Sequence, residues 1–281
     1  MDLLDPSDDL VFKILFKDPE AERRLIAMLT AILEPPVPIV SATVLNPQLP
    51  PELATGKAVV LDIRIVLGDG RRICIELEAR PRRIFIQRDL FYWSRAYSGQ
   101  LDAGENYAAL RPTIAIAWLG DPKDGSRSIV DSPRVHTRYR ICETMTHVEL
   151  TDHLEIHLLD LRKLPDDATL SASLQRWAEF FSHPTSETLR RLAQEDEIMA
   201  ETIKKLEEVS ADGELRYLVE ARKMGEYQRR IYEGAAHEEG LERGRAEGRA
   251  EGREEGALAA RKRIALNLFA DGFTADRIAS L

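Results

Sequence analysis

Three carboxylates, Asp62, Glu76 and Glu78, are spaced so that they can meet on one face of a β-hairpin. They lie in residues 59–67 (VVLDIRIVL) and 71–79 (RRICIELEA), two segments in which apolar and polar residues alternate. Such alternation is typical of β-strands, whose successive side chains point to opposite faces. The sequence GDG between the two segments is a turn signal, so we expect a hairpin.

The register of this hairpin follows from the length of its loop. With a three-residue loop, Leu67 pairs with Arg71, and counting back places Asp62 directly opposite Glu76. Glu78 then lies one diagonal away on the same face, while the aliphatic residues of both strands share the other face. A slip of one residue would turn the acids into the core, so the pattern favours this register.

Two carboxylates that face each other destabilise a hairpin unless something offsets their charge. A divalent cation would do so, because Mg²⁺ binds oxygen ligands, commonly one or two carboxylates with water and a substrate phosphate. A cation held by Asp62 and Glu76 would polarise a phosphodiester and lower the pKa of an attacking water. The alternative is a solvated face on which the acids pair with Arg64, Arg71 or Arg72.

The segments around the hairpin have the order of an α/β domain that ends near residue 165. Apolar residues recur at helical spacing over residues 8–34, with a break at Asp18-Pro19, because proline disfavours helix just before itself. Further along the chain we expect a helix over 84–104 and strands over 112–119, 134–141 and 154–161.

From about residue 170 the pattern is entirely helical. We expect helices over 170–182, 186–208 and 214–233, and the high charge of this part predicts that it forms no deep core. The chain therefore divides into a domain over residues 1–165, a helical region over 166–235 and a charged Gly-repeat helical tail over 236–281.

Four segments of the first half carry a family resemblance. They are DPSDDLVFKILF (5–16), LDIRIVLGDGRRICIELEAR (61–80), QRDLFYWSRAYSGQLDAGENYAALRP (87–112) and IAIAWL (114–119). Together they resemble the opening helix, the strand–turn–strand, the Arg-x-x-x-Tyr helix and the next core strand of the recombination-promoting nuclease and transposase-like family, within the PD-(D/E)XK nuclease superfamily. The tail with glycine at every fourth position is also typical of relatives.

The resemblance implies a restriction-endonuclease-like core, with a mixed central sheet flanked by helices, followed by an all-α C-terminal region. It also implies cleavage of double-stranded DNA with Mg²⁺ (or Mn²⁺), with Asp62 and Glu76 as the metal carboxylates. Glu78 departs from the family, since relatives usually have Gln there and the wider superfamily has Lys. Either Glu78 acts as a third metal ligand or a base, or it marks a weakened or inactive site.

The resemblance also suggests residues that border the carboxylates. Arg88 and Tyr92 share one helical face, where Arg88 would contact a phosphate and Tyr92 a catalytic carboxylate or the DNA. The alternative is a core Tyr92 beside a surface Arg88. Asp9 and Lys13 either approach the site from the first helix or form a surface ion pair. A basic cluster that would hold the DNA backbone follows the acidic strand and consists of Arg80, Arg82 and Arg83.

Composition limits the remaining functions. The net charge is −9, so any DNA binding must use a local basic patch or cations that shield the acids. The two cysteines make no disulfide framework, and the histidines lack the spacing of a metal motif. There is no signal-peptide pattern and no apolar run near the roughly 20 residues of a membrane helix, which predicts a cytoplasmic protein without a membrane partner.

Glycine recurs at every fourth position of the tail, at Gly240, Gly244, Gly248, Gly252 and Gly256. In one helix these residues form a stripe, with a row of arginines on one flank and a row of glutamates on the other. Each glycine costs a helix about 1 kcal/mol relative to alanine, whereas small residues let two helices approach closely. A parallel pair brings Arg rows to Glu rows, which predicts a homodimer; a flexible, solvated repeat is the alternative.

The sequence therefore predicts a metal-dependent DNA endonuclease that promotes recombination or transposition. Two alternatives stay open: a catalytically weakened DNA-binding or interaction protein with the same fold, and a purely structural oligomeriser. Metal-dependent cutting distinguishes the first function from the second, and DNA binding distinguishes the second from the third.

Overall fold

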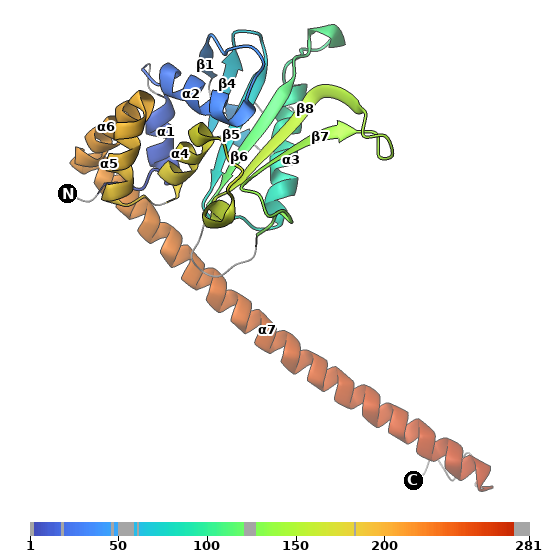
Figure 1. Cartoon of the computed structure of the whole chain (residues 1–281). Coiled ribbons are helices and arrows are strands. Elements are labelled where there is room, and N and C mark those ends of the chain that lie inside the picture. The colour runs from blue at the N-terminus through green and yellow to red at the C-terminus, as the bar shows by residue number, and fades with distance from the viewer. Residues whose placement is uncertain are drawn as a thin grey trace. The chain divides into compact units, whose positions relative to one another are not determined.

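A six-stranded mixed sheet forms the centre of the fold in the computed structural model (Figure 1). Strands β5, β6 and β8 run parallel, and the pairs β1–β4, β4–β5 and β7–β8 are antiparallel. The order across the sheet is β1 (Ala42–Leu45), β4 (Ile63–Leu67), β5 (Arg72–Glu78), β6 (Thr113–Leu119), β8 (Glu149–Asp160) and β7 (His136–Cys142), while β2 (Gln48–Leu49) pairs separately with β3 (Val59–Val60). The structure describes residues 3–17, 20–45, 48–49, 59–60, 62–120, 128–182 and 184–272.

The predicted hairpin and its register are confirmed in β4 and β5. Val66 pairs with Arg72, and continuing this register by four residues places Asp62 opposite Glu76. Gly70 closes the three-residue loop with a φ of 89°, a left-handed conformation that glycine adopts without strain. Turn chemistry and the two-residue period of the strands thus agree, and both place the acids on one face.

Helices cover both faces of the sheet (Figure 1). On one face lie α1 (Asp9–Lys17), α2 (Glu22–Leu33) and α4 (Ala172–Phe181), and on the other lies α3 (Ile84–Ser98). The aliphatic face of the hairpin packs against α1 and α2, and its acidic face turns toward α3. The chain has the predicted architecture of a mixed sheet flanked by helices and followed by a helical region. The predicted break at Asp18-Pro19 lies outside the described residues.

Three predicted helix boundaries were wrong, one of them because the helix expected over 214–233 continues to Ala270. The helix expected over 186–208 is divided into α5 (Ser186–Glu195) and α6 (Glu197–Ala211) by Asp196. The backbone of Asp196 is extended, and its side chain accepts hydrogen bonds from backbone N–H groups in the first turn of α6, so it ends one helix and caps the next. Helix α3 ends before residue 104, with Gly99 as its C-cap residue.

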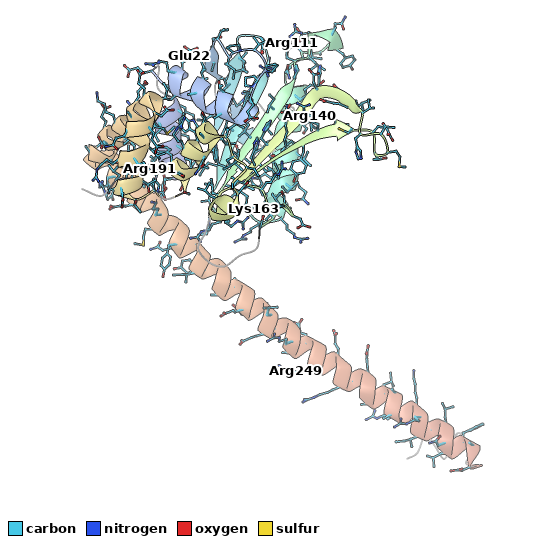
Figure 2. The ribbon with its side chains drawn as sticks, viewed as in Figure 1. Glu22, Arg111, Arg140, Lys163, Arg191 and Arg249 are labelled. Atoms are coloured by element: carbon cyan, nitrogen blue, oxygen red, sulfur yellow. The ribbon has the colours of Figure 1, made fainter. Side chains whose placement is uncertain are left out.

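The C-terminal part is one long helix, α7 (Gly213–Ala270), which is exposed along most of its length. Figure 2 shows the side chain of Arg249 projecting away from this helix. Contacts divide the chain into one unit over Met1–Val219 and another over Glu220–Leu281, and the predicted division at residues 165 and 235 stays a prediction. Two short 3₁₀ helices are η1 (Tyr107–Ala109) and η2 (Leu161–Asp166). In the described ranges, no helix is long and apolar enough to cross a lipid bilayer.

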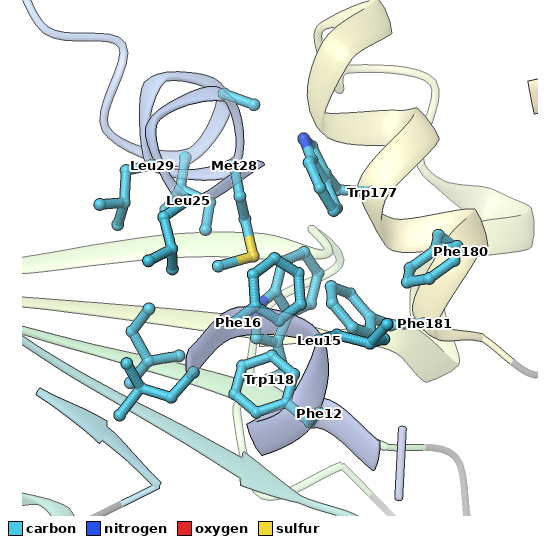
Figure 3. Close-up of a cluster of buried hydrophobic side chains, with 14 of the residues drawn as sticks. Phe12, Leu15, Phe16, Leu25, Met28, Leu29, Trp118, Trp177, Phe180 and Phe181 are labelled. Atoms are coloured by element: carbon cyan, nitrogen blue, oxygen red, sulfur yellow. The ribbon is translucent and has the colours of Figure 1, made fainter. Parts of the chain in front are cut away.

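Aromatic side chains fill the core between the sheet and helices α1, α2 and α4 (Figure 3). The ring centroid of Trp118 lies 4.8 Å from that of Phe181, which in turn lies 5.7 Å from that of Phe12. Trp177 and Phe180 of α4 are buried in the same cluster. The prediction that the C-terminal helices form no deep core was therefore wrong for α4, because this helix separates its charged residues from one strongly apolar face.

Candidate active site

Asp62 and Glu76 form a buried carboxylate pair at one end of the hairpin. Asp62 directly precedes β4, and Glu76 lies in the second half of β5. The backbone N–H of Asp62 donates to Oε1 of Glu76 at 3.1 Å, and the N–H of Leu77 donates to Oδ2 of Asp62 at 2.8 Å. Only 8% of Asp62 and 7% of Glu76 is exposed. The backbone therefore fixes both acids in place away from bulk water.

Burial raises the pKa of both acids. The pKa of Asp62 rises to about 6, chiefly through burial and then through a hydrogen bond with Asp9. The pKa of Glu76 rises to about 8, again chiefly through burial, with the negative charge of Asp62 as the second cause. The ionised form of Glu76 is therefore disfavoured when no cation takes that place. Strongly shifted acids that lie together are typical of functional sites.

Helix α1 brings a cation to this pair. Nζ of Lys13 lies 2.8 Å from Oδ1 of Asp62 and 2.5 Å from Oδ1 of Asp9. Burial alone would lower the pKa of Lys13, but its hydrogen bonds with Asp62 and Asp9 raise it, so the ammonium stays charged. The structure thus brings Asp9 and Lys13 to the carboxylates from a helix almost fifty residues earlier in the chain.

Glu78 contacts an arginine. Its Oε2 accepts a hydrogen bond from Nη2 of Arg88 at 2.5 Å, and its Oε1 accepts one from the backbone N–H of Arg80 at 3.2 Å. The guanidinium of Arg88 lies 5.0 Å from the ring centroid of Phe85 and 5.9 Å from that of Tyr92. Burial raises the pKa of Tyr92, which is half-buried in this position. Glu78, Arg88 and Tyr92 therefore lie together on the α3 side of the hairpin.

Asp89 of α3 is a further candidate, which the hairpin motif does not include. Its side chain is buried, and burial raises its pKa to about 6. It shares the buried side of α3 with Phe85 and Ala96, and its charge contributes to the raised pKa of Glu76. An aspartate at helical spacing from two apolar positions is the sequence signal that would have identified it.

The arginines between β5 and α3 lie on the surface. Arg80, Arg82 and Arg83 are all exposed, and the backbone N–H of Arg80 contacts Glu78. These guanidinium groups are accessible to a large ligand such as a nucleic-acid backbone. Their position next to Glu78 places positive charge at the border of the acidic site.

The two buried carboxylates fit a divalent cation by their chemistry. Mg²⁺ usually binds one or two carboxylates and completes its shell with water and phosphate oxygens. Within the described residues, Oε2 of Glu76 has no hydrogen-bond partner, and no three His, Cys, Asp or Glu side chains are grouped as a metal cage. Oδ1 of Asp62 already contacts one cation, the ammonium of Lys13.

A mixed six-stranded sheet flanked by helices and followed by a helical region is consistent with a PD-(D/E)XK nuclease fold. The family model described as PD-(D/E)XK nuclease family transposase matches residues 6–231, and the chain belongs to this family. This result confirms the resemblance seen in the sequence and supports a nuclease, a hydrolase with DNA as its substrate, in general terms. No curated protein and no solved structure matched the chain.

Proposed function

We propose that the chain is a metal-dependent DNA endonuclease that hydrolyses phosphodiester bonds in recombination or transposition, in the cytoplasm. The observation that carries this proposal is the pair of buried acids, Asp62 and Glu76, with pKa values raised to about 6 and about 8. Ionising both acids in this position costs free energy, and binding of a divalent cation offsets that cost. Family membership supports the same activity.

Asp62 and Glu76 are the residues that would hold Mg²⁺ (or Mn²⁺). When bound, the cation polarises the phosphodiester and lowers the pKa of the attacking water. Lys13 offsets the charge of Asp62 and is the ammonium group beside the pair. In this proposal Lys13 supplies the positive charge that a lysine supplies in the wider superfamily at the position of Glu78.

The arginines bind the DNA backbone in this proposal. Double-stranded DNA presents phosphates that exposed guanidinium groups contact, and such contacts position the duplex. Arg88 lies closest to the acids, and its 2.5 Å hydrogen bond with Glu78 holds it in place while Tyr92 packs beside it. Glu78 is thus a positioning residue for Arg88. The exposed cluster that extends the contact consists of Arg80, Arg82 and Arg83.

The alternative function is a catalytically weakened DNA-binding or interaction protein that retains the nuclease fold. The observation in its favour is Glu78, which places a carboxylate where the wider superfamily has a lysine. A carboxylate cannot donate positive charge to a phosphate or orient water in the same way. This alternative predicts DNA binding without metal-dependent cutting.

Plasmid cleavage by the full-length protein tests the proposal. Supercoiled DNA is incubated with the protein and Mg²⁺, Mn²⁺, Ca²⁺ or EDTA, beside the variants Asp62→Ala and Glu76→Ala. We expect nicking and cutting with Mg²⁺ or Mn²⁺ only, and none with either variant. Glu149→Ala, which removes an exposed acid of β8, is the control that should still cut. Cutting by both site variants overturns the proposal, and wild-type DNA binding without cutting supports the alternative.

We further propose that residues 1–165 form the nuclease domain, 166–235 a helical region, and 236–281 a tail that joins two copies in a parallel homodimer. Helix α7 is continuous through the Gly repeat, and a Cβ atom added at Gly240, Gly244 or Gly248 would meet open space. The stripe is therefore uncovered within one chain and available to a second copy. Arg243 pairs with Glu239 along the helix, and both side chains are exposed.

The molar mass of the protein in solution tests the dimer. We expect light scattering to give about twice the chain mass of 31.8 kDa. The double variant Gly244→Leu with Gly248→Leu should become monomeric, since leucine prevents close approach of the helices. Ala246→Leu with Ala250→Leu changes the opposite side of the same helix and should leave the dimer intact. A monomeric wild type, or a dimer that tolerates the glycine substitutions, contradicts the proposal.

A further inference from the structure

Helix α3 exposes large apolar side chains next to the candidate active site. Ile84, Leu90 and Phe91 are 68%, 41% and 42% exposed, respectively. The other side of α3 packs on β5 and β6. Exposed apolar groups that cluster on one helix face are typical of binding surfaces.

The same surface is strongly basic in an acidic protein. Residues 79–101 contain one acidic residue, Asp89, and its side chain is buried. The chain as a whole has a net charge of −9, so the charge of this segment is opposite in sign to that of the chain. The arginines of the segment are Arg80, Arg82, Arg83, Arg88 and Arg95. Positive charge interleaved with exposed apolar groups is complementary to a polyanion that also presents flat apolar faces.

Side-chain contacts connect this surface to the carboxylates. The ring of Phe91 lies 6.3 Å from that of Tyr92, measured between centroids. Tyr92 lies beside the guanidinium of Arg88, which donates to Glu78 on the acidic strand. A ligand that covers Phe91 therefore also lies next to Arg88, at the border of the site.

We propose that the outer face of α3 binds unpaired DNA bases, with Phe91 stacking on a base and Ile84 and Leu90 packing beside it. In an intact duplex the faces of the bases are covered by their neighbours, so an exposed phenyl ring has no partner there. In a bubble, fork or single strand the faces are accessible, and aromatic side chains stack on them without regard to sequence. The surrounding arginines hold the backbone through its phosphates. This inference deepens the proposed function and rests on it for the choice of DNA.

Equilibrium binding without cleavage tests this proposal. Full-length protein in EDTA is titrated into three fluorescently labelled DNAs of equal length: a perfect duplex, a duplex with a central bubble, and a single strand. Fluorescence anisotropy measures each affinity. We expect the wild type to bind the bubble and the single strand more tightly than the duplex. Phe91→Ala should weaken binding to both of them by about 5- to 150-fold, the range for loss of one stacked base.

Matched variants separate stacking from charge and from folding. Phe91→Trp keeps an aromatic face and should retain the preference for unpaired DNA. Tyr139→Ala removes an aromatic residue of β7 with a similar exposure of 45% and should change nothing. Arg83→Ala should weaken binding to all three DNAs alike and reduce the dependence of affinity on salt. Thermal melts confirm that each variant is folded.

Several outcomes would overturn the inference. Equal affinities of the wild type for all three DNAs, or no binding to any of them, would do so. A Phe91→Ala variant that binds unpaired DNA as tightly as the wild type would also overturn it, and a protein partner would then be the better candidate for the apolar face. These results are independent of catalysis. A protein that prefers unpaired DNA but cuts no plasmid refutes the nuclease alone, and one that cuts plasmid without this preference refutes the α3 surface alone.

Discussion

Two buried acidic sites of the described sheet, Asp160 and the pair of Asp62 and Glu76, differ in how the protein balances their charge. Asp160, at the end of β8, is 1% exposed and accepts hydrogen bonds from Arg162 at 2.8 Å and from Ser128, with Nζ of Lys163 at 3.4 Å. Burial alone would raise the pKa of Asp160, but these partners lower it below its usual value. Asp62 is also buried, yet its pKa rises to about 6.

The number of cations per acid, and not the depth of burial, separates the two sites. Asp160 is one carboxylate with two basic partners, whereas Asp62 shares Lys13 with Asp9 and also faces Glu76. A buried acid with two cationic partners is stable in its ionised form without a bound metal ion. A buried pair with too few cations destabilises the fold until a cation binds. Surplus negative charge is therefore the property that identifies the candidate active site.

Amide substitutions at the two acidic sites should differ most in their effect on DNA cleavage. We expect Asp62→Asn and Glu76→Gln to lower the rate of metal-dependent plasmid cleavage by roughly 10²–10³-fold, because a neutral amide holds a divalent cation poorly. Asp160→Asn should cut at a rate close to that of the wild type per folded molecule. The folded fraction is measured by circular dichroism, and equal losses of activity in all three variants would remove the distinction.

The same substitution at Asp160 should have the larger effect on stability. Asp160→Asn removes the carboxylate that the partly buried Arg162 and Lys163 contact, and we expect the free energy of unfolding to fall by about 3 kcal/mol. Urea unfolding followed by circular dichroism measures this change. Glu149→Gln is the matched control on β8, since its pair with Arg140 is partly exposed and contributes at most about 1 kcal/mol. An unchanged stability of Asp160→Asn would mean that its partners do not hold the strand end.

The unbalanced site should show the opposite dependence on pH. The pKa of Glu76 is raised to about 8 in the folded protein, so the folded state binds more protons than the unfolded state. Stability therefore falls as the pH rises from the usual glutamate pKa of roughly 4.3 through about 8. Gln is neutral throughout, so Glu76→Gln should stabilise the metal-free protein at pH 8.5 and change its stability very little at pH 4.

Urea titrations at both pH values in EDTA measure this difference. Asp160→Asn provides the control of opposite sign, because the lowered pKa of Asp160 contributes stability that is present above the usual aspartate pKa and lost as the pH falls. If Glu76→Gln had the same effect at both pH values, the burial of an ionised pair would not be the cause.

The sequence predicted the hairpin site closely because its constraints are local. A two-residue period, a GDG loop and the segregation of acids from aliphatic residues determine the register that places Asp62 opposite Glu76. The partners of the acids depend on tertiary packing. Nothing in the local pattern around Lys13 or Arg88 distinguishes a surface ion pair from the contacts with Asp62 and Glu78 that the structure shows.

The helical part of the fold could also be predicted only as far as local sequence patterns determine it. The helical pattern over residues 170–182 and 186–208 was recognised. The high average charge of this part nevertheless gave no indication of the apolar face by which α4 buries Trp177 and Phe181. The break between α5 and α6 at Asp196 depends on one capping side chain within a pattern that is otherwise continuous. Asp89 was missed although its helical spacing from Phe85 and Ala96 places it on the buried side of α3, because the sequence motif was sought in the hairpin alone.

Glu78 differs from Asp62 and Glu76 because it has an arginine partner, Arg88. Arg88 is 40% exposed, so solvent screens the pair, and Glu78→Gln should change the free energy of unfolding by less than about 1 kcal/mol. Gln retains an oxygen that accepts from Arg88, so cleavage should stay within about tenfold of the wild type. Plasmid cleavage and urea unfolding measure both effects. A large gain of cleavage in Glu78→Gln would instead show that the carboxylate of Glu78 lowers the cleavage rate. The negative charge of Glu78 would then be as poorly balanced as that of Asp62 and Glu76.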